Sequence, residues 1–146
     1  MAYQIKRRQK TIEKLELADE NGKVIYVLEV QLDADDMVKK IHRKYTELTR
    51  ALSETTEIKH KTESGEEIEE CIEKLGHAVV SLFEAVFGTD DTRKILDFYD
   101  SRYIEMCRDV VPFITKVVIP KLQKINEENR KKVKMTYDRK KEWYKK

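Results

Sequence analysis

The chain has 146 residues, a length typical of a single domain that can bury a core. Charged residues make up 40% of it, against the usual quarter, so much of its helical surface must face solvent. The net charge of +2 is uneven, because residues 1–10 carry +4, residues 130–146 carry +7 and the segment between them carries −9. No stretch approaches the roughly 18 uninterrupted apolar residues of a membrane span, and no apolar run of signal-peptide length follows the basic N-terminus. We therefore expect neither membrane spanning nor export by a cleaved signal.

The first predicted element is a β-hairpin over residues 12–31. Two runs that contain apolar residues flank Asn21-Gly22, the dipeptide that most readily accepts the positive φ angles of a two-residue type I′ turn. A two-stranded hairpin is marginally stable by itself in water. We therefore expect this one to lie on the helices or on another copy of itself.

Helices are expected over residues 34–56, 65–87, 90–111 and 113–129. Apolar residues of the first recur in steps of three and four, which is typical of a helix packed on one side. The second has a predicted inward face that consists of Ile68, Ile72, Leu75, Val79, Leu82, Phe83 and Val86.

The last two predicted helices meet at Pro112, because proline is best tolerated in the first turn of a helix. Pro120 falls further along and should kink the fourth helix or end it early. The predicted class is therefore α+β and predominantly helical, with the hairpin and about four helices in one domain over residues 1–129. Residues 130–146 are predicted to form a basic helical extension or a mobile tail.

Several groups of polar residues have side chains that can carry out chemistry. Glu73 and His77 have i,i+4 spacing and could in principle ligate a metal, but an acidic, solvated helix face explains them better. Cys71 and Cys107 lie in helical patterns without a C-x-x-C partner, which is typical of buried, reduced thiols in a cytosolic protein. Neither a phosphate-binding glycine loop nor a nucleophile elbow is present. We expect no enzyme activity, no catalytic or metal site and no cofactor.

The basic C-terminal end supports an alternative function. Tyr137, Trp143 and Tyr144 are interleaved with bases that could neutralise phosphates while the aromatic rings stack on nucleobases. The acidic body and the absence of a nucleic-acid-binding motif favour a solvated tail or an acidic protein partner instead. A small nucleic-acid-binding protein remains the alternative. Its basic residues would be Arg130, Lys131, Lys132, Lys134, Arg139, Lys140, Lys141, Lys145 and Lys146.

The order of residues along most of the chain resembles the small tail assembly chaperones of Gram-positive siphophages and their prophages. The resemblance starts with the basic opening and the Asn-Gly hairpin and is densest in the C-terminal half. Its departures are the basic end from Lys131 and the polar segment 53–65. The residues that carry it are Ala2-Tyr3-Gln4-Ile5-Lys6-Arg7-Arg8, Phe87-Gly88, Lys94-Ile95-Leu96-Asp97-Phe98-Tyr99, Tyr103-Ile104-Glu105-Met106, Val111-Pro112-Phe113-Ile114 and Ile119-Pro120-Lys121-Leu122-Gln123.

This resemblance implies a chaperone that coats the long tape measure protein in the cytoplasm of the bacterial host. Such a protein shields amphipathic helices of the tape measure protein before the tail tube forms and is absent from the mature virion. Further partners that it implies are the major tail (tube) protein and other copies of the chain. Aromatic and aliphatic side chains at helical spacing are the candidate binding residues: Tyr99, Tyr103, Phe113, Val117, Ile125 and Val133.

Overall fold

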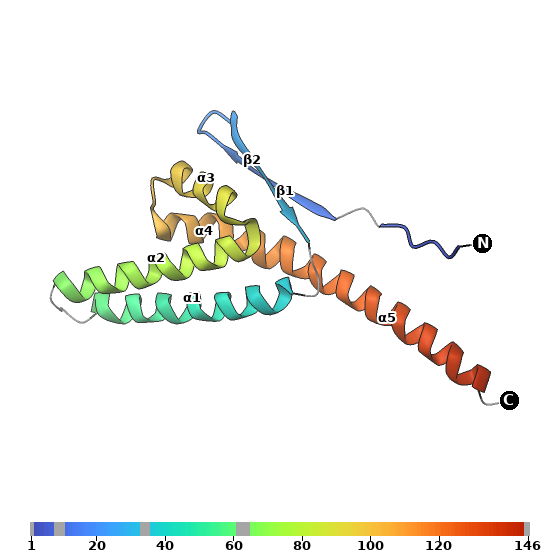
Figure 1. The fold of residues 1–146 in the computed structure, drawn as a ribbon. Helices are drawn as coiled ribbons and strands as arrows, with labels where there is room; N and C mark the ends of the chain where they lie inside the picture. Colours follow the sequence, from blue (N-terminus) through green and yellow to red (C-terminus); the bar gives the residue numbers. More distant parts are fainter. Residues whose placement is uncertain (1, 8–10, 33–35, 61–64, 145–146) are drawn as a thin grey trace.

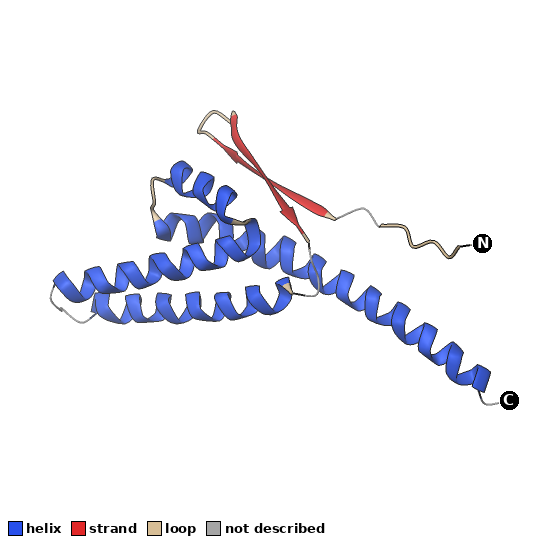
Figure 2. Cartoon of the chain, viewed as in Figure 1, coloured by secondary structure: helices blue, strands red, loops and turns tan. Residues whose placement is uncertain are grey.

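The computed structural model describes residues 2–7, 11–32, 36–60 and 65–144. An antiparallel hairpin precedes a set of packed helices (Figures 1 and 2), so the predicted class, α+β and predominantly helical, is confirmed. Two long helices, α1 (Met37–His60) and α2 (Gly65–Phe87), lie side by side, and the shorter α3 (Thr89–Tyr99) and α4 (Tyr103–Phe113) cover one side of α2. The final helix, α5 (Ile119–Tyr144), leaves this body and projects beyond it (Figure 1).

The hairpin consists of β1 (Ile12–Ala18) and β2 (Val24–Gln31), paired so that Leu15 lies opposite Leu28. Side chains alternate between the two faces of a strand, and here one face is buried against the helices. Leu28 is fully buried on that face, whereas Ile25 and Val27 on the other face are about half exposed, at 51% and 47%. As expected from its size, the hairpin lies on the helices, mainly through β2.

The loop of the hairpin differs from the predicted two-residue turn. It spans Asp19 to Lys23, and among its described residues only Gly22 has a positive φ, of 84°. A type I′ turn needs positive φ at both central residues. Instead, the Asp19 carboxylate accepts hydrogen bonds from the backbone N–H groups of Asn21 and Lys23, both at 2.9 Å. This side-chain cap stabilises the longer loop.

The helix pair α1–α2 follows the predicted ranges with two differences. Helix α1 continues to His60, beyond the predicted end at residue 56, and residues 34 and 35 of the predicted range lie outside the described residues. Helix α2 has the predicted bounds, but Ile68 and Ile72 do not face the core as expected, since they are 44% and 47% exposed. The first turns of α2 extend past the elements that cover its later turns.

The prediction of one helix over residues 90–111 is wrong, because the chain turns between α3 and α4. Asp100 adopts the left-handed conformation, with φ 51° and ψ 41°, and Ser101 also has a positive φ. The Ser101 N–H donates to the carbonyl of Leu96 at 2.9 Å, which is the six-residue closure of a Schellman motif. Asp tolerates this conformation better than most residues, so it can end a helix without glycine.

The predicted break at Pro112 is also wrong, because α4 continues through it into a π-helical turn, η1 (Ile114–Val118), and on into α5. In this turn the Ile119 N–H donates to the carbonyl of Ile114, five residues back. A π-helical turn widens the helix locally. This wider turn makes room for the ring of a following proline, which would otherwise clash with a carbonyl of the preceding turn, and it does not need the N–H that proline lacks. Pro120, the second residue of α5, is accommodated in this way.

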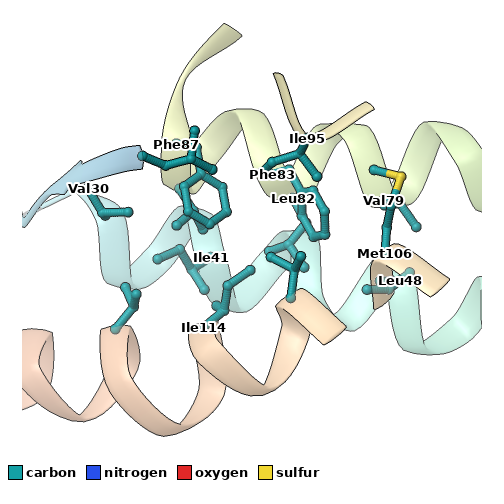
Figure 3. Packing of buried hydrophobic residues seen from close by; sticks show 14 of the residues in the cluster. Val30, Ile41, Leu48, Val79, Leu82, Phe83, Phe87, Ile95, Met106 and Ile114 are labelled. Carbon is teal, nitrogen blue, oxygen red and sulfur yellow. The ribbon is translucent and has the colours of Figure 1, made fainter. Parts of the chain in front are cut away.

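One hydrophobic cluster joins the hairpin to all of these helices (Figure 3). Phe83 of α2 is fully buried near its centre, and its ring meets that of Phe87 edge-on at 6.0 Å. The Phe113 ring, at the end of α4, stacks on Phe87 at 6.1 Å. Because the same cluster includes Leu28 of β2 and Leu122 of α5, the hairpin and the base of α5 are tied to one core.

Candidate protein-binding surfaces

An apolar groove lies at the end of the molecule where α1 ends and α2 begins. It has a volume of about 560 Å³, which is within the range of pockets that bind ligands. Exposed isoleucines from two helices form much of its wall: Ile68 and Ile72 of α2 and Ile104 of α4, at 44%, 47% and 51% exposure. The other lining residues are Thr55, Cys71, Leu75, Ser101, Arg102, Tyr103 and Glu105.

A glycine sets how closely α4 approaches α2 beside the groove. A methyl group at Gly76 would lie 2.7 Å from Cε2 and 2.8 Å from Cζ of the Tyr103 ring, closer than real side chains approach. The ring therefore occupies the space that a larger residue on α2 would fill. This contact places the first turn of α4, with Ile104, at the side of the groove.

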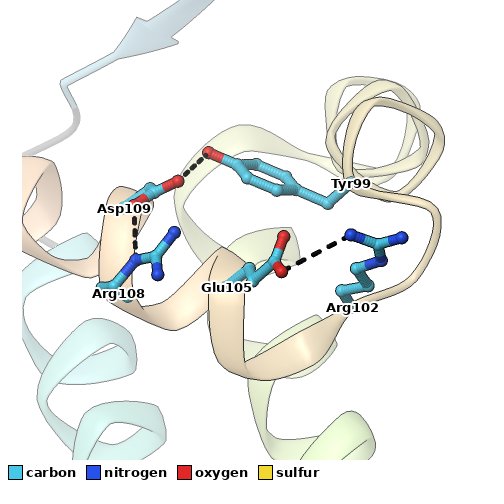
Figure 4. Close-up of polar contacts among 5 residues, drawn as sticks. All are labelled: Tyr99, Arg102, Glu105, Arg108 and Asp109. Carbon is cyan, nitrogen blue, oxygen red and sulfur yellow. Dashed lines mark hydrogen bonds and ion pairs between the residues drawn. The ribbon is translucent and has the colours of Figure 1, made fainter.

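Polar contacts stabilise the turn between α3 and α4, next to the groove wall that Ile104 forms. The Tyr99 hydroxyl of α3 donates to a carboxylate oxygen of Asp109 in α4 at 3.2 Å, and Arg108 Nε donates to the other oxygen at 3.1 Å (Figure 4). Burial, followed by the charge of Asp109, raises the pKa of Tyr99 from 10.0 to about 12. An ion pair of 3.5 Å between Arg102 and Glu105 lies in the same turn (Figure 4). Of these contacts, the Tyr99–Asp109 hydrogen bond joins α3 to α4, whereas the two arginine contacts lie within α4 and its first turn.

Both cysteines are free thiols and half-buried, so neither is fully buried as the sequence led us to expect. Burial raises the pKa of the Cys107 thiol to about 11, which makes it a poor nucleophile at neutral pH. Cys71 lies in the wall of the apolar groove.

The structure does not bring the six predicted binding residues together. Tyr99, Tyr103, Phe113, Val117 and Ile125 are half-buried, whereas Val133 is 70% exposed on the projecting part of α5. Of the six, Tyr103 lines the groove.

Sequence reasoning missed the groove residues Ile68, Ile72 and Ile104 as a site. One signal was available, since glutamates surround Ile68 and Ile72 in the run Gly65-Glu-Glu-Ile-Glu-Glu-Cys-Ile-Glu73. Isoleucines in such a run lie next to charged side chains that face solvent, so they can remain exposed themselves.

The basic end lies on α5, at the opposite end of the molecule from the groove (Figure 1). Where α5 leaves the body, an ion pair between Lys121 and Glu13 links it to β1. All side chains of residues 127–135, here called the α5 extension, are exposed. The extension includes four predicted basic residues, Arg130, Lys131, Lys132 and Lys134; Arg139, Lys140 and Lys141 follow on α5, and Lys145 and Lys146 lie outside the described residues.

Among the described residues, no three His, Cys, Asp or Glu side chains are grouped so that they could hold a metal ion, and Glu73 with His77 forms no such group. None of the described helices is long and apolar enough to cross a membrane. Comparison with known protein families, curated proteins and solved structures finds no match to this chain.

Proposed function

We propose that this protein is an assembly chaperone that binds and solubilises helical segments of the tape measure protein during phage tail morphogenesis. It would act as a binding protein in the bacterial host cytoplasm, without catalysis or a cofactor, and leave before the virion is complete. The observation that supports this proposal from the structure is the exposed apolar groove. The choice of the tape measure protein as the partner rests on the resemblance of the residue order to tail assembly chaperones.

The groove has the chemistry that helix-in-groove recognition requires. Its isoleucines can take apolar side chains spaced three or four residues apart on a partner helix. None of the five glutamates of residues 65–73 lines the groove, but the negative charge that they give this part of α2 favours a partner helix that carries Lys or Arg. Weak sites of this kind, repeated along one long partner, bind by avidity and can still be displaced by tube subunits.

Co-expression with the tape measure protein, followed by size-exclusion chromatography with light scattering, tests the proposal. We expect a soluble complex with many copies of the chain on each tape measure protein. The double variant Ile68→Glu/Ile72→Glu should lose the complex, whereas Ile25→Glu/Val27→Glu, at equally exposed hairpin positions, should retain it. A tape measure protein that stays insoluble beside soluble wild-type chain would refute the proposal.

Nucleic-acid binding is the alternative, and the exposed bases of the α5 extension are the observation that favours it. It would show as affinity for DNA or RNA that falls steeply with salt and is lost when residues 130–146 are deleted. The groove variant should bind nucleic acid as the wild type does, which separates the two functions.

A further inference from the structure

The hairpin leaves one edge of strand β1 open. Among the described residues the sheet consists of β1 and β2 alone, so each strand has one edge without a neighbouring strand. Strand β2 makes the main contacts of the hairpin with α2 and α3, so the edge of β1 is the more accessible of the two. A strand edge of this kind presents unpaired N–H and C=O groups and can add a further strand.

The hydrogen bonds of the hairpin show which backbone groups point to this edge. The Thr11 carbonyl accepts a hydrogen bond from the Leu32 N–H at 2.9 Å, where the two strands begin to pair. Successive residues of an antiparallel strand direct their backbone groups alternately to its two sides. The odd-numbered residues of β1 therefore bond to β2, whereas Ile12, Lys14 and Glu16 direct their N–H and C=O groups to the open edge. The side chains of these three residues are exposed.

The charges on β1 are only partly matched within the chain. Lys14 lies opposite Glu29 of β2, and its ammonium group is 4.0 Å from the Glu29 carboxylate. Glu16 instead lies opposite Val27. Among the described residues, none forms an ion pair with Glu16. Its carboxylate is therefore free to meet a cation from outside the chain.

We propose that the β1 edges of two copies pair antiparallel about a two-fold axis at Leu15, which joins the two hairpins into one four-stranded sheet. In this register Lys14 of each copy lies opposite Glu16 of the other, and the two residues exchange main-chain hydrogen bonds. The exposed Ile12 lies opposite Ala18 at each end of the pair. The two Leu15 side chains, which are half-buried in one copy, meet at the axis.

The charge pattern of β1 is the argument for a second copy as the occupant. Residues directly opposite each other project to the same face of a sheet, so the axis must pass through a residue. An axis at Lys14 or at Glu16 sets like charges opposite each other, which destabilises strand pairing, and axes further out leave fewer residues paired. On the face towards the helices, Glu13 lies opposite Leu17, with its carboxylate still paired to Lys121.

Such a contact uses the same edge of both copies, so association stops at the dimer. A single pair of strands covers less than the roughly 1,200 Å² at which stable interfaces begin, so we expect a dissociation constant in the micromolar range or weaker. The dimer does not rest on the proposed chaperone function. It leaves the apolar groove free, because the described groove residues lie on the helices and on the turn before α4.

Sedimentation velocity of the purified full-length chain, after nuclease treatment and without any partner, tests this proposal. We expect the weight-average mass to rise with concentration from the 17.4 kDa of the monomer towards twice that value and no further. Amide hydrogen exchange at Lys14 and Glu16 should slow as the concentration rises, because their N–H groups become hydrogen-bonded in the dimer. A chain that stays monomeric up to about 1 mM would overturn the proposal. A dimer in which these two amides exchange as fast as in the monomer would also overturn it.

Charge reversals test the register. Lys14→Glu and Glu16→Lys should each weaken self-association by about tenfold or more, because like charges then lie opposite each other twice in every dimer. An equimolar mixture of the two variants should dimerise about as strongly as the wild type, since each pair across the interface is again Lys with Glu. Misfolding of a variant cannot produce this recovery. The proposal fails if either variant alone dimerises as the wild type does, or if the mixture stays monomeric.

Matched controls carry the same charge changes elsewhere on the surface. Lys39→Glu on α1 and Glu84→Lys on α2 alter exposed residues away from β1 and should dimerise as the wild type does. The groove variant Ile68→Glu/Ile72→Glu should also dimerise. If the groove variant is monomeric instead, the copies meet through the groove and the proposal is wrong. Because these experiments omit the tape measure protein, their outcome is independent of the chaperone test.

Discussion

Replacing Gly76 with alanine tests how tightly α4 is seated on α2. In an ordinary helix interior, Gly→Ala stabilises by up to about 1 kcal/mol, because glycine loses more backbone entropy on folding. Here the added methyl group would lie 2.7 Å from the Tyr103 ring. The ring is half-buried and belongs to the first residue of α4, so relieving the clash requires α4 or the ring to move.

Overpacking of this kind costs about 1–3 kcal/mol, which outweighs the helical gain. We therefore expect Gly76→Ala to lower the free energy of unfolding by about 1–2 kcal/mol, measured by urea denaturation with circular dichroism and an unchanged m-value. The control is Gly65→Ala at the start of α2, where an added methyl group meets nothing within 4 Å. It should be neutral or stabilising.

A double-mutant cycle isolates the contact itself. In a Tyr103→Ala background the ring is gone, so Gly76→Ala should become neutral or stabilising there, as at Gly65. If Gly76→Ala stabilises the otherwise wild-type chain as much as Gly65→Ala does, α4 does not approach α2 this closely. The contact between Tyr103 and Gly76 would then not be what places Ile104 at the side of the groove.

Two further predictions concern the hairpin and the α3–α4 turn. Leu28→Ala, at a fully buried position of β2, should lower the free energy of unfolding, measured by urea denaturation, by about 2–5 kcal/mol. Val27→Ala, at the exposed neighbouring position, should change it by less than about 0.5 kcal/mol. Equally small effects of both variants would mean that the hairpin is not part of the core. The pKa of Tyr99, about 12 in the folded chain, makes folding stability fall as pH rises from 10 towards 12, because the unfolded state loses this proton first. This pKa can be measured by absorbance titration of tyrosinate, with Tyr99→Phe as the reference. Asp109→Asn should lower the pKa of Tyr99, while burial should keep it above 10.0. An unchanged pKa in Asp109→Asn would exclude Asp109 as a cause.

The elements that depend on local sequence were largely predictable. Asn21-Gly22 marked the hairpin, and the three- and four-residue spacing of apolar residues marked α1 and α2, because both signals arise from backbone geometry within a few residues. Proline was the misleading signal. Pro112 predicted a break and Pro120 a kink or an early end, but the helix continues through both prolines, with a π-helical turn between them. The break occurs instead at Asp100-Ser101, where hydrogen bonds to α3 carbonyls stabilise positive φ angles.

The sequence by itself determined the fold class, the order of the hairpin and helices, and the separation of an acidic body from basic ends. The tertiary structure decided which apolar residues remain exposed. Ile72 and Leu75 both lie on the predicted inward face of α2, yet one is 47% exposed and the other is buried. Periodicity gives the direction in which a side chain points, but burial also requires another element to cover it. That cover depends on where α3 turns into α4 and how closely Tyr103 approaches Gly76, which are contacts between residues far apart in the chain.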